Sequence, residues 1–367
     1  MVSISLCMIV RNEEKTLARC LDTIHDIVDE IIIVDTGSID ATKEIAARYT
    51  DLIYDFEWVD NFAIARNFSF SKATKEYCMW MDADDVLELE DQKKLKLLKE
   101  NMDGSIDTIL MRYNMTSKED GALTYTFYRE RLVKRSRGFE WHNPVHEYLL
   151  FEGTSKQVDI AITHKKIDLP TDRNLRIFEK YIADGNELMP RDCFYYAREL
   201  YNVKEYKKAI DYFNRFLVTK DGLLSSYLDS CIDMAKCYHM LGDDEMELKS
   251  LLRFFEIQKP RAEICCKIGY YFKDRKDLDK AIGWFSLAPY TDKPTTSIGA
   301  ILPQCWDYVP YMELCSCWFQ KGNIDLALQY NQKAVDAKPN DRKAVANRAF
   351  LASKKKELVE KMNKEAK

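Results

Sequence analysis

The sequence lacks three features that would place it in common classes of protein. It has no excess of basic residues, since 55 Lys and Arg face 60 Asp and Glu, and this argues against a general nucleic-acid-binding protein. It has eleven cysteines but no CxxC pair, which favours buried thiols in a reducing cytosol over a disulfide scaffold or a zinc site. It has no apolar run of membrane-spanning length, and its start lacks the basic stretch and cleavage site of a signal peptide. We therefore expect a cytoplasmic protein that has no membrane span and binds no nucleic acid.

The first half of the 367-residue chain alternates short β-rich apolar runs with segments of helical spacing. The apolar runs cover residues 3–10, 29–38, 51–58 and 77–85. This alternation predicts an α/β domain over residues 1–169, with a mostly parallel sheet that is covered on both faces. Because ligands bind at the carboxyl ends of the strands in such sheets, we expect the functional site at "VDTGS" and "MDADD".

From residue 170 to 367 the β signal ends and a helical pattern repeats. Small and apolar residues recur at offsets 0, 3 and 12, as Ala197, Leu200 and Ala209, as Gly269, Phe272 and Ala281, and as Cys315, Trp318 and Ala327. The pattern is similar to the tetratricopeptide repeat, in which small residues lie where two antiparallel helices cross. We expect residues 170–367 to form an all-α domain of tetratricopeptide-like repeats that ends in a polar capping helix.

The stretch "YCMWMDADD" (residues 77–85) joins an apolar strand to three carboxylates. On an extended chain Asp82 and Asp84 point the same way, and two carboxylates at a strand end suit Mg²⁺ or Mn²⁺. The residues alone leave alternatives open. The acids also suit a turn before a helix that Asp85 caps, and a DxD pair also occurs in other metal enzymes such as phosphohydrolases.

Four motifs together resemble one enzyme family: "SLCMIVRNEE" at the start, "IIIVDTGSIDAT" on the next strand, "FAIARNFSFSKAT" before the acidic strand, and "MDADD". With these motifs in this order, residues 1–169 resemble a family-2 glycosyltransferase domain of the GT-A fold. With the helical repeats added, the chain resembles bacterial peptide glycosyltransferases of the sublancin type, which attach a sugar to a cysteine of a small peptide.

The resemblance implies how a nucleotide-sugar donor is bound. Asp84 would coordinate Mn²⁺ or Mg²⁺, and His164, at the end of the domain, would complete the metal shell. Asp82 would touch the ribose or support the metal, and Asp35 would accept a hydrogen bond from uracil. Arg66 would help to neutralise the diphosphate, a task suited to a guanidinium.

Two residues near the start keep more than one interpretation. Arg11 stands where many relatives carry a tyrosine that stacks on the base, although a guanidinium plane can also stack on a ring. Glu13 suits either a contact to the nucleotide sugar or the first turn of a helix.

The block "RGFEWHNPVHEYLLF" is expected to serve the acceptor side. In the family, a loop of the form W…VHE lies beside the acceptor site. This implies Glu147 as the general base, with Asp85 as the rival base. Trp141 would face the sugar or the acceptor, and its alternative is packing in the core.

The resemblance implies a metal-dependent, inverting transfer of a hexose from a UDP-sugar, with glucose as the default sugar. The acceptor expected from it is a Cys or Ser side chain of a peptide that the helical repeats hold in part. The helical half is also a candidate surface for a homodimer. Two alternatives remain: a repeat scaffold that binds peptide or nucleotide sugar without turnover, and an enzyme whose acceptor is a cell-envelope glycan or a lipid-linked sugar.

Overall fold

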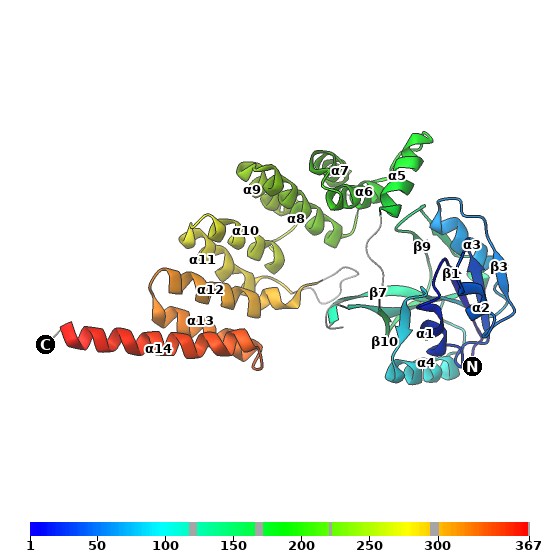
Figure 1. Ribbon diagram of the computed structural model, residues 1–367, viewed down its shortest axis with the longest axis horizontal. Helices are drawn as coiled ribbons and strands as arrows, with labels where there is room; N and C mark the ends of the chain where they lie inside the picture. Colours follow the sequence, from blue (N-terminus) through cyan, green and yellow to red (C-terminus); the bar gives the residue numbers. More distant parts are fainter. Residues whose placement is uncertain (117–122, 166–171, 220–221, 294–300, 366–367) are drawn as a thin grey trace. The chain divides into compact units, whose positions relative to one another are not determined.

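The computed structural model describes residues 1–116, 123–165, 172–219, 222–293 and 301–365. The chain divides into two compact units, of which the first contains residues 1–188 and the second begins at Met189 (Figure 1). Helix α5 (Arg173–Ala183) follows the sequence-based domain limit at residue 169 and is part of the first unit.

One mixed sheet organises the described part of the first unit, with the strand order β3-β2-β1-β4-β7-β6-β10-β5. Its strands are β1 (Ile4–Val10), β2 (Glu30–Asp35), β3 (Ile53–Asp55), β4 (Tyr77–Trp80), β5 (Asp85–Leu87), β6 (Thr108–Thr116), β7 (Leu123–Lys134) and β10 (Ser155–His164). Strands β1 to β4 pair in parallel, as their apolar runs predict. Strand β7 is antiparallel to β4 and β6, and β5 is antiparallel to β10, so the sheet is mixed beyond β4.

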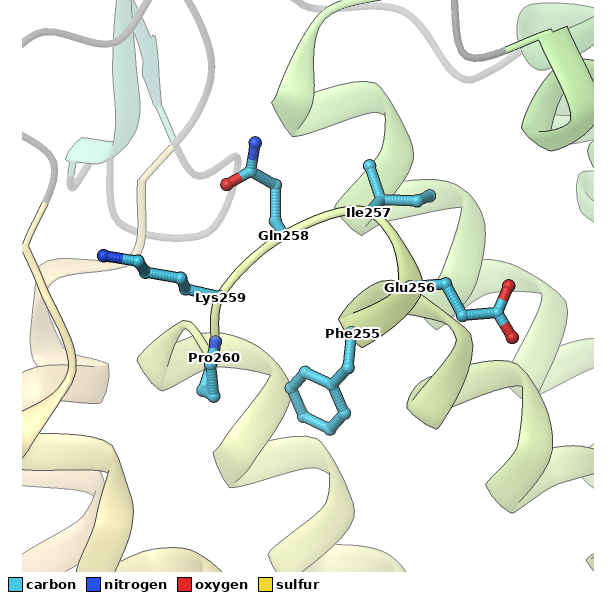
Figure 2. Close-up of a pocket in the computed structure, with 6 residues that line it drawn as sticks. All are labelled: Phe255, Glu256, Ile257, Gln258, Lys259 and Pro260. Atoms are coloured by element: carbon cyan, nitrogen blue, oxygen red, sulfur yellow. The ribbon is translucent and has the colours of Figure 1, made fainter.

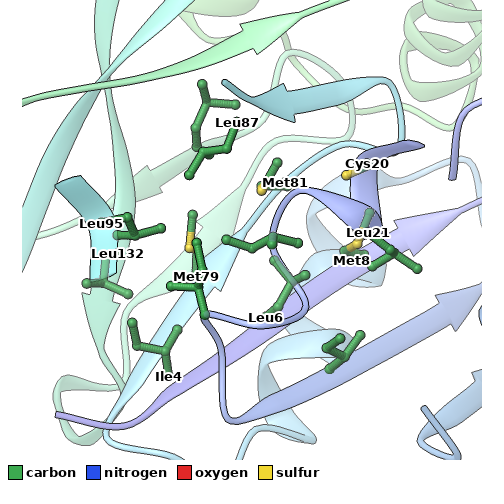
Figure 3. Close-up of a cluster of buried hydrophobic side chains, with 14 of the residues drawn as sticks. Ile4, Leu6, Met8, Cys20, Leu21, Met79, Met81, Leu87, Leu95 and Leu132 are labelled. Carbon is green, nitrogen blue, oxygen red and sulfur yellow. The ribbon is translucent and has the colours of Figure 1, made fainter. Parts of the chain in front are cut away.

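Both faces of the sheet are covered, because alternate residues of a strand point to opposite faces. Ile4, Leu6 and Met8 of β1 pack on one face, with α1 (Leu17–Asp22), α2 (Thr42–Ala46) and α4 (Leu89–Asn101) (Figure 3). Cys7 of β1 belongs to the other face, which α3 (Phe62–Ser71) covers with the hairpin of β8 (Glu140–His142) and β9 (Tyr148–Leu150). The parallel strands therefore end together at one edge, between two packed layers.

The second unit consists of helix pairs followed by a long last helix. The pairs are α6 (Pro190–Asn202) with α7 (Tyr206–Thr219), α8 (Leu224–Leu241) with α9 (Asp244–Leu252), α10 (Ala262–Asp274) with α11 (Leu278–Leu287), and α12 (Tyr308–Gln320) with α13 (Ile324–Ala337), and the last helix is α14 (Arg342–Glu365). Figure 1 shows them stacked in chain order. The repeat pattern of the sequence is confirmed, because Ala197, Ala209, Ala281 and Ala327 are fully buried.

The aromatic position of the repeat shows why small residues face it. Phe285 of α11 is fully buried, and a Cβ added at Gly269 of α10 would come within 2.7 Å of its ring. The last pair departs from this rule, since the equivalent position is Asn331. Its Nδ2 donates to the carbonyl of Ala344 at 3.1 Å and so ties α13 to α14.

Two expectations about the whole chain can be compared with this fold. All eleven cysteines are buried and free of disulfide bonds, as the absence of a CxxC pair predicts. Among the described residues, no helix combines the length and the apolar character that a membrane crossing requires.

Candidate active site

The acidic stretch leaves the sheet at the carboxyl end of β4, as predicted, but not as an extended chain. All four residues of β4 are buried, and the next residues form a turn in which the Asp85 N–H donates to the Asp82 carbonyl at 3.0 Å. The Asp82 N–H in return donates to Oδ2 of Asp85 at 3.1 Å. The expectation that Asp82 and Asp84 share one side of an extended strand is therefore wrong. The turn brings Asp85 into the site as well, because β5 starts there.

Asp84, Asp85 and His164 form a group that is able to hold a cation. Among the described residues, these three offer ligand atoms that all lie within 4.8 Å of one another. His164 Nδ1 lies 3.3 Å from Oδ1 of Asp84 and 3.2 Å from Oδ1 of Asp85. Two carboxylate oxygens and an imidazole nitrogen suit Mn²⁺, and the carboxylates alone suit Mg²⁺. The pair Asp84 and His164 expected from the sequence is thus together, and Asp82 lies outside this group.

The protonation of His164 reflects this acidic surrounding. Burial alone lowers the pKa of His164, but hydrogen bonds to Asp84 and Asp85 raise it to about 10. In the metal-free protein the imidazolium therefore balances the carboxylates. A bound cation would take over that role, since a metal ligand must be deprotonated.

Asp85 is enclosed on every side. It is fully buried, and its Oδ1 accepts the hydroxyl hydrogen of Tyr113 at 2.8 Å in addition to facing His164. Its Oδ2 accepts from the backbone of Asp82 and from Nη1 of Arg131 at 3.2 Å. With both oxygens engaged, Asp85 is held as an orienting group at the centre of the site.

Arg131 of β7 was not among the residues singled out from the sequence. Its side chain is fully buried, and its guanidinium lies 3.6 Å from the ring centroid of Trp80 and 4.3 Å from that of Tyr113. Nη1 also donates to the Trp80 carbonyl at 3.1 Å. The segment "RERLVK" starts with three charged residues in a row. Such residues are mostly exposed, so no signal in the sequence indicates this burial.

Arg66 of α3 connects Asp82 to the loop that carries Glu147. Its Nε donates to Oε1 of Glu147 at 2.7 Å, and its Nη2 donates to Oδ1 of Asp82 at 2.8 Å. Burial alone lowers the pKa of Arg66, but the two carboxylates raise it above its usual value. For Asp82 the signs are reversed: burial alone raises its pKa, but the charges of Arg66 and Arg131 lower it to about 2. Asp82 is therefore held as an ion.

The hairpin of β8 and β9 places Glu147 beside Arg66. Trp141 is 2% exposed and packs edge-on against Trp80 at 5.1 Å, and its backbone is bonded to the side chain of Asn67 in both directions. Trp141 therefore lies in the core, which was its alternative interpretation. Just before Glu147, His146 has a φ of 52°, a conformation that L-residues other than Asn and Gly rarely adopt. The tip of the hairpin is thus held in an unusual shape.

The remaining expected residues lie at the ends of β1 and β2. Asp35 is 1% exposed; its Oδ1 accepts from the backbone of Gly37 and Ser38, and its Oδ2 is buried without a hydrogen-bond partner. Oε2 of Glu13 accepts from the hydroxyl of Thr16 at 2.5 Å, and Arg11 is exposed. A buried carboxylate oxygen without a donor is unusual, and it marks Asp35 as a place where a ligand N–H would be accepted.

Arg173 of α5 interacts electrostatically with carboxylates from two parts of the site, Glu13 after β1 and the pair Asp82 and Glu147. Partial burial lowers its pKa, and the carboxylates of Glu147, Glu13 and Asp82 oppose this shift. Its guanidinium also lies 4.7 Å from the ring of Phe62 on α3. The first unit thus needs α5 beside the site, although the sequence pattern placed this helix with the repeats.

A separate hollow of about 450 Å³ lies in the second unit. Figure 2 shows its lining, residues 255–260, which comprise the end of η2 (Arg253–Glu256) and the loop that leads to α10. This segment carries one acidic and one basic side chain, Glu256 and Lys259. It has no group of metal-ligating or paired acidic residues like the one at the end of β4, so we place the candidate active site at β4.

Comparisons with known proteins show what the two parts of the chain are similar to. Residues 5–152 match the model of glycosyl transferase family 2. The glycosyltransferase SunS of Bacillus subtilis prophage SPbeta is 27% identical over 286 residues, which cover 73% of this chain and 65% of SunS. A TPR repeat-containing protein of Synechococcus elongatus is 34% identical over 147 residues, which cover 40% of this chain and 35% of that protein. The chain thus spans about two thirds of SunS and about a third of the Synechococcus elongatus protein.

Among solved structures, a crystal structure of MamA protein is similar at a TM-score of 0.35 and 19% identity, over 45% of this chain and 81% of MamA. The family match, the mixed sheet and the acidic turn after β4 assign the first unit. The stacked helix pairs and their buried small residues assign the second. The first unit is a glycosyl transferase family 2 domain, and it is followed by a unit of tetratricopeptide-like helical repeats.

Proposed function

We propose that this protein is a metal-dependent glycosyltransferase that moves a hexose from a UDP-sugar to an acceptor with inversion at the anomeric carbon. The observation that carries the proposal is the arrangement at the end of β4. There the group Asp84, Asp85 and His164 adjoins the ion-paired carboxylates Asp82 and Glu147. A family 2 domain with an intact acidic site is expected to turn over its donor.

The residues present fit a divalent cation. Asp84 and His164 are the proposed ligands, while Asp85, whose two oxygens are already engaged, keeps them in place. When bound, Mn²⁺ or Mg²⁺ supplies positive charge that stabilises the departing nucleoside diphosphate. The chain's own contribution is a set of ligands that is oriented before the donor arrives.

The donor's base is proposed to lie at Asp35. Its buried Oδ2 has no donor, and an imino N–H of uracil would supply one. Asp82 is proposed to face the ribose, because its side chain is 35% exposed, whereas those of Arg66 and Glu147 are 7% and 14% exposed. Glucose remains the first sugar to test.

Glu147 is the proposed general base. It lies on a hairpin tip whose backbone is held in an unusual conformation, and 14% of its side chain is exposed. It would accept the proton of the acceptor as the acceptor attacks the anomeric carbon. The alternative base, Asp85, is fully buried and has partners on both oxygens, which disfavours a transfer to substrate.

The proposed acceptor is a Cys or Ser side chain of a peptide. Support comes from the second unit, since stacked helical repeats present an extended surface of the kind that binds peptides. The chain is proposed to act in the cytoplasm, in keeping with its eleven free thiols.

The test is to incubate the protein with UDP-glucose, UDP-galactose, UDP-N-acetylglucosamine and GDP-mannose, each with Mn²⁺, Mg²⁺ or a chelator, and to measure release of the nucleoside diphosphate. We expect release from a UDP-sugar that requires metal and falls about 100-fold or more in Asp84→Ala. Glu90→Ala serves as the control, because this carboxylate is 77% exposed on α4. Candidate peptides with one Cys or one Ser are then added, and sugar transfer is read from their mass.

Binding of a UDP-sugar with no release, with or without peptide, would contradict the proposal and support a scaffold without turnover. Transfer to a lipid-linked or cell-envelope sugar, with none to the peptides, would keep the enzyme and replace the acceptor.

A further inference from the structure

Arg66 is confined more tightly than a ligand-binding arginine needs to be. Its side chain is 7% exposed, and its guanidinium carbon lies 4.9 Å from the ring centroid of Trp80 and 5.0 Å from that of Trp141. The two indoles touch each other edge-on. The guanidinium is therefore packed against both aromatic rings, in the corner that they form, which restricts the plane in which its N–H groups point.

Within that plane, Arg66 donates in two different directions. Nε–H reaches Glu147 at 2.7 Å and Nη2–H reaches Asp82 at 2.8 Å. The three residues come from α3, from the turn after β4 and from the loop between β8 and β9. One side chain thus sets the separation between a carboxylate on the donor side and the proposed base on the acceptor side.

The charge balance argues against a direct role on the diphosphate. Arg66 already pairs with two carboxylates, and only 7% of its side chain is exposed for a phosphate oxygen to reach. If the guanidinium turned towards a phosphate, Glu147, which is 14% exposed, would lose its partner, and an unpaired buried charge is strongly unfavourable. The interaction that the structure shows is therefore also the one that desolvation favours.

We propose that Arg66 is a positioning residue that fixes Glu147 relative to Asp82, and that it does not bind the diphosphate of the donor. This inference rests on the proposed function, because it assigns Arg66 a task within the same site. It differs from what the family resemblance implies for this arginine. A lysine cannot replace it, since an ammonium on a flexible stem does not hold two N–H groups in the fixed directions that packing against the two rings gives a guanidinium.

The test uses Arg66→Lys, which keeps the positive charge. Affinities for UDP and for uridine are measured by calorimetry in the presence of Mn²⁺, and kcat and KM are measured from UDP release. We expect the variant to bind UDP within about threefold of the unchanged protein. We expect kcat to fall about 100-fold with KM little changed, since a misplacement of about 1 Å costs this much.

Arg129→Lys is the matched control. Arg129 lies 4.9 Å from the ring centroid of the same Trp80 and pairs with Glu130 at 3.0 Å, so this variant alters a guanidinium on the same indole without touching Glu147 or Asp82. We expect its kcat and its UDP affinity to remain within about threefold. A thermal melt of each variant reports folding, and Arg66→Gln provides a second variant that keeps a donor group.

A tenfold or greater loss of UDP affinity in Arg66→Lys, with uridine binding unchanged, would show that Arg66 binds the diphosphate and would overturn the inference. An unchanged kcat in both Arg66 variants would overturn it as well. Failure of the proposed function looks different: the unchanged protein itself would then bind no UDP or release none.

Discussion

Two places in the interior of this protein, one in each unit, are filled in different ways. At the end of β4 the first unit buries charge, with Arg131 and Asp85 both fully enclosed. Where α10 crosses α11, the second unit buries apolar groups that fit closely together, with Gly269 against the ring of Phe285. Burying an ion pair brings little net stability, because desolvation offsets the attraction. The charged interior is therefore best explained by what the site does, and the apolar one by packing alone.

The largest expected effect comes from breaking the charged interior. Arg131→Met leaves Asp85 buried without its guanidinium partner, and we expect the free energy of unfolding of the first unit to fall by about 3–5 kcal/mol. Denaturant unfolding followed by tryptophan fluorescence measures this loss. Lys93→Ala is the control, since it removes an exposed pair with Glu90 that is worth at most about 1 kcal/mol. A similar, small loss in both variants would mean that breaking the buried ion pair costs no more than breaking the exposed one.

The next effect is a dependence of the stability of the first unit on pH. The pKa of His164 is raised to about 10 in the folded protein, so its protonated form stabilises the metal-free first unit. This contribution is complete below the ordinary histidine pKa of about 6.5 and is lost as pH rises towards 10, with a slope of up to about 1.4 kcal/mol per pH unit. Unfolding free energies in chelator between pH 6 and 10 check this for the native sequence and for His164→Gln. The variant should lack the slope, and an equal slope in both proteins would contradict the prediction.

The apolar interior can be tested with a pair of glycines. In Gly269→Ala the added Cβ would come within 2.7 Å of the Phe285 ring, and we expect the second unit to lose about 1–3 kcal/mol. Gly283 lies on the facing helix α11 with open space around a Cβ, so Gly283→Ala should be neutral or stabilise by up to about 1 kcal/mol. Thermal unfolding of both variants compares them, and equal losses would exclude a steric origin.

The smallest effect compares helix caps in the two units. Asn61 caps α3 by accepting from the Ile64 amide, and Asn323 caps α13 by accepting from the Leu326 amide. Replacing either residue by Ala should cost about 1 kcal/mol. Only Asn61→Ala should also lower UDP release, because α3 carries Arg66. Equal activity in the two variants would indicate that the site tolerates movement of α3.

The sequence was sufficient for those parts of the fold that periodicity determines. The apolar runs predicted β1, β2 and β4, and since parallel strands end at one edge, Asp35 and Asp82 were expected there together. The spacing of small residues such as Ala197 and Ala209 predicted the repeats. The proximity of Asp84 to His164 came from the family resemblance, because no local pattern links residues so far apart in the chain.

Other parts of the site depend on contacts that no pattern shows. Arg131 belongs to a run of three charged residues that suggests a solvated segment, yet its guanidinium packs on Trp80 and Tyr113. The turn after β4 arises from mutual hydrogen bonds between Asp82 and Asp85, whereas the sequence pattern suggested an extended chain. Helix α5 looked like the start of the repeats because its own spacing is helical, and only contacts such as the ion pair of Lys180 with Asp60 show what it covers.

Strand β5 has only three residues and forms the outer edge of the sheet, where its pairing with β10 sets Asp85 opposite His164. A slip of one residue along this short ladder would turn the carboxylate of Asp85 to the opposite face of the sheet, away from His164. At the proposed cation site, binding of Mn²⁺ would therefore report whether the last strand is paired correctly. A preparation with native helical content but with β5 in the wrong register would look folded by circular dichroism and would still fail to bind the ion.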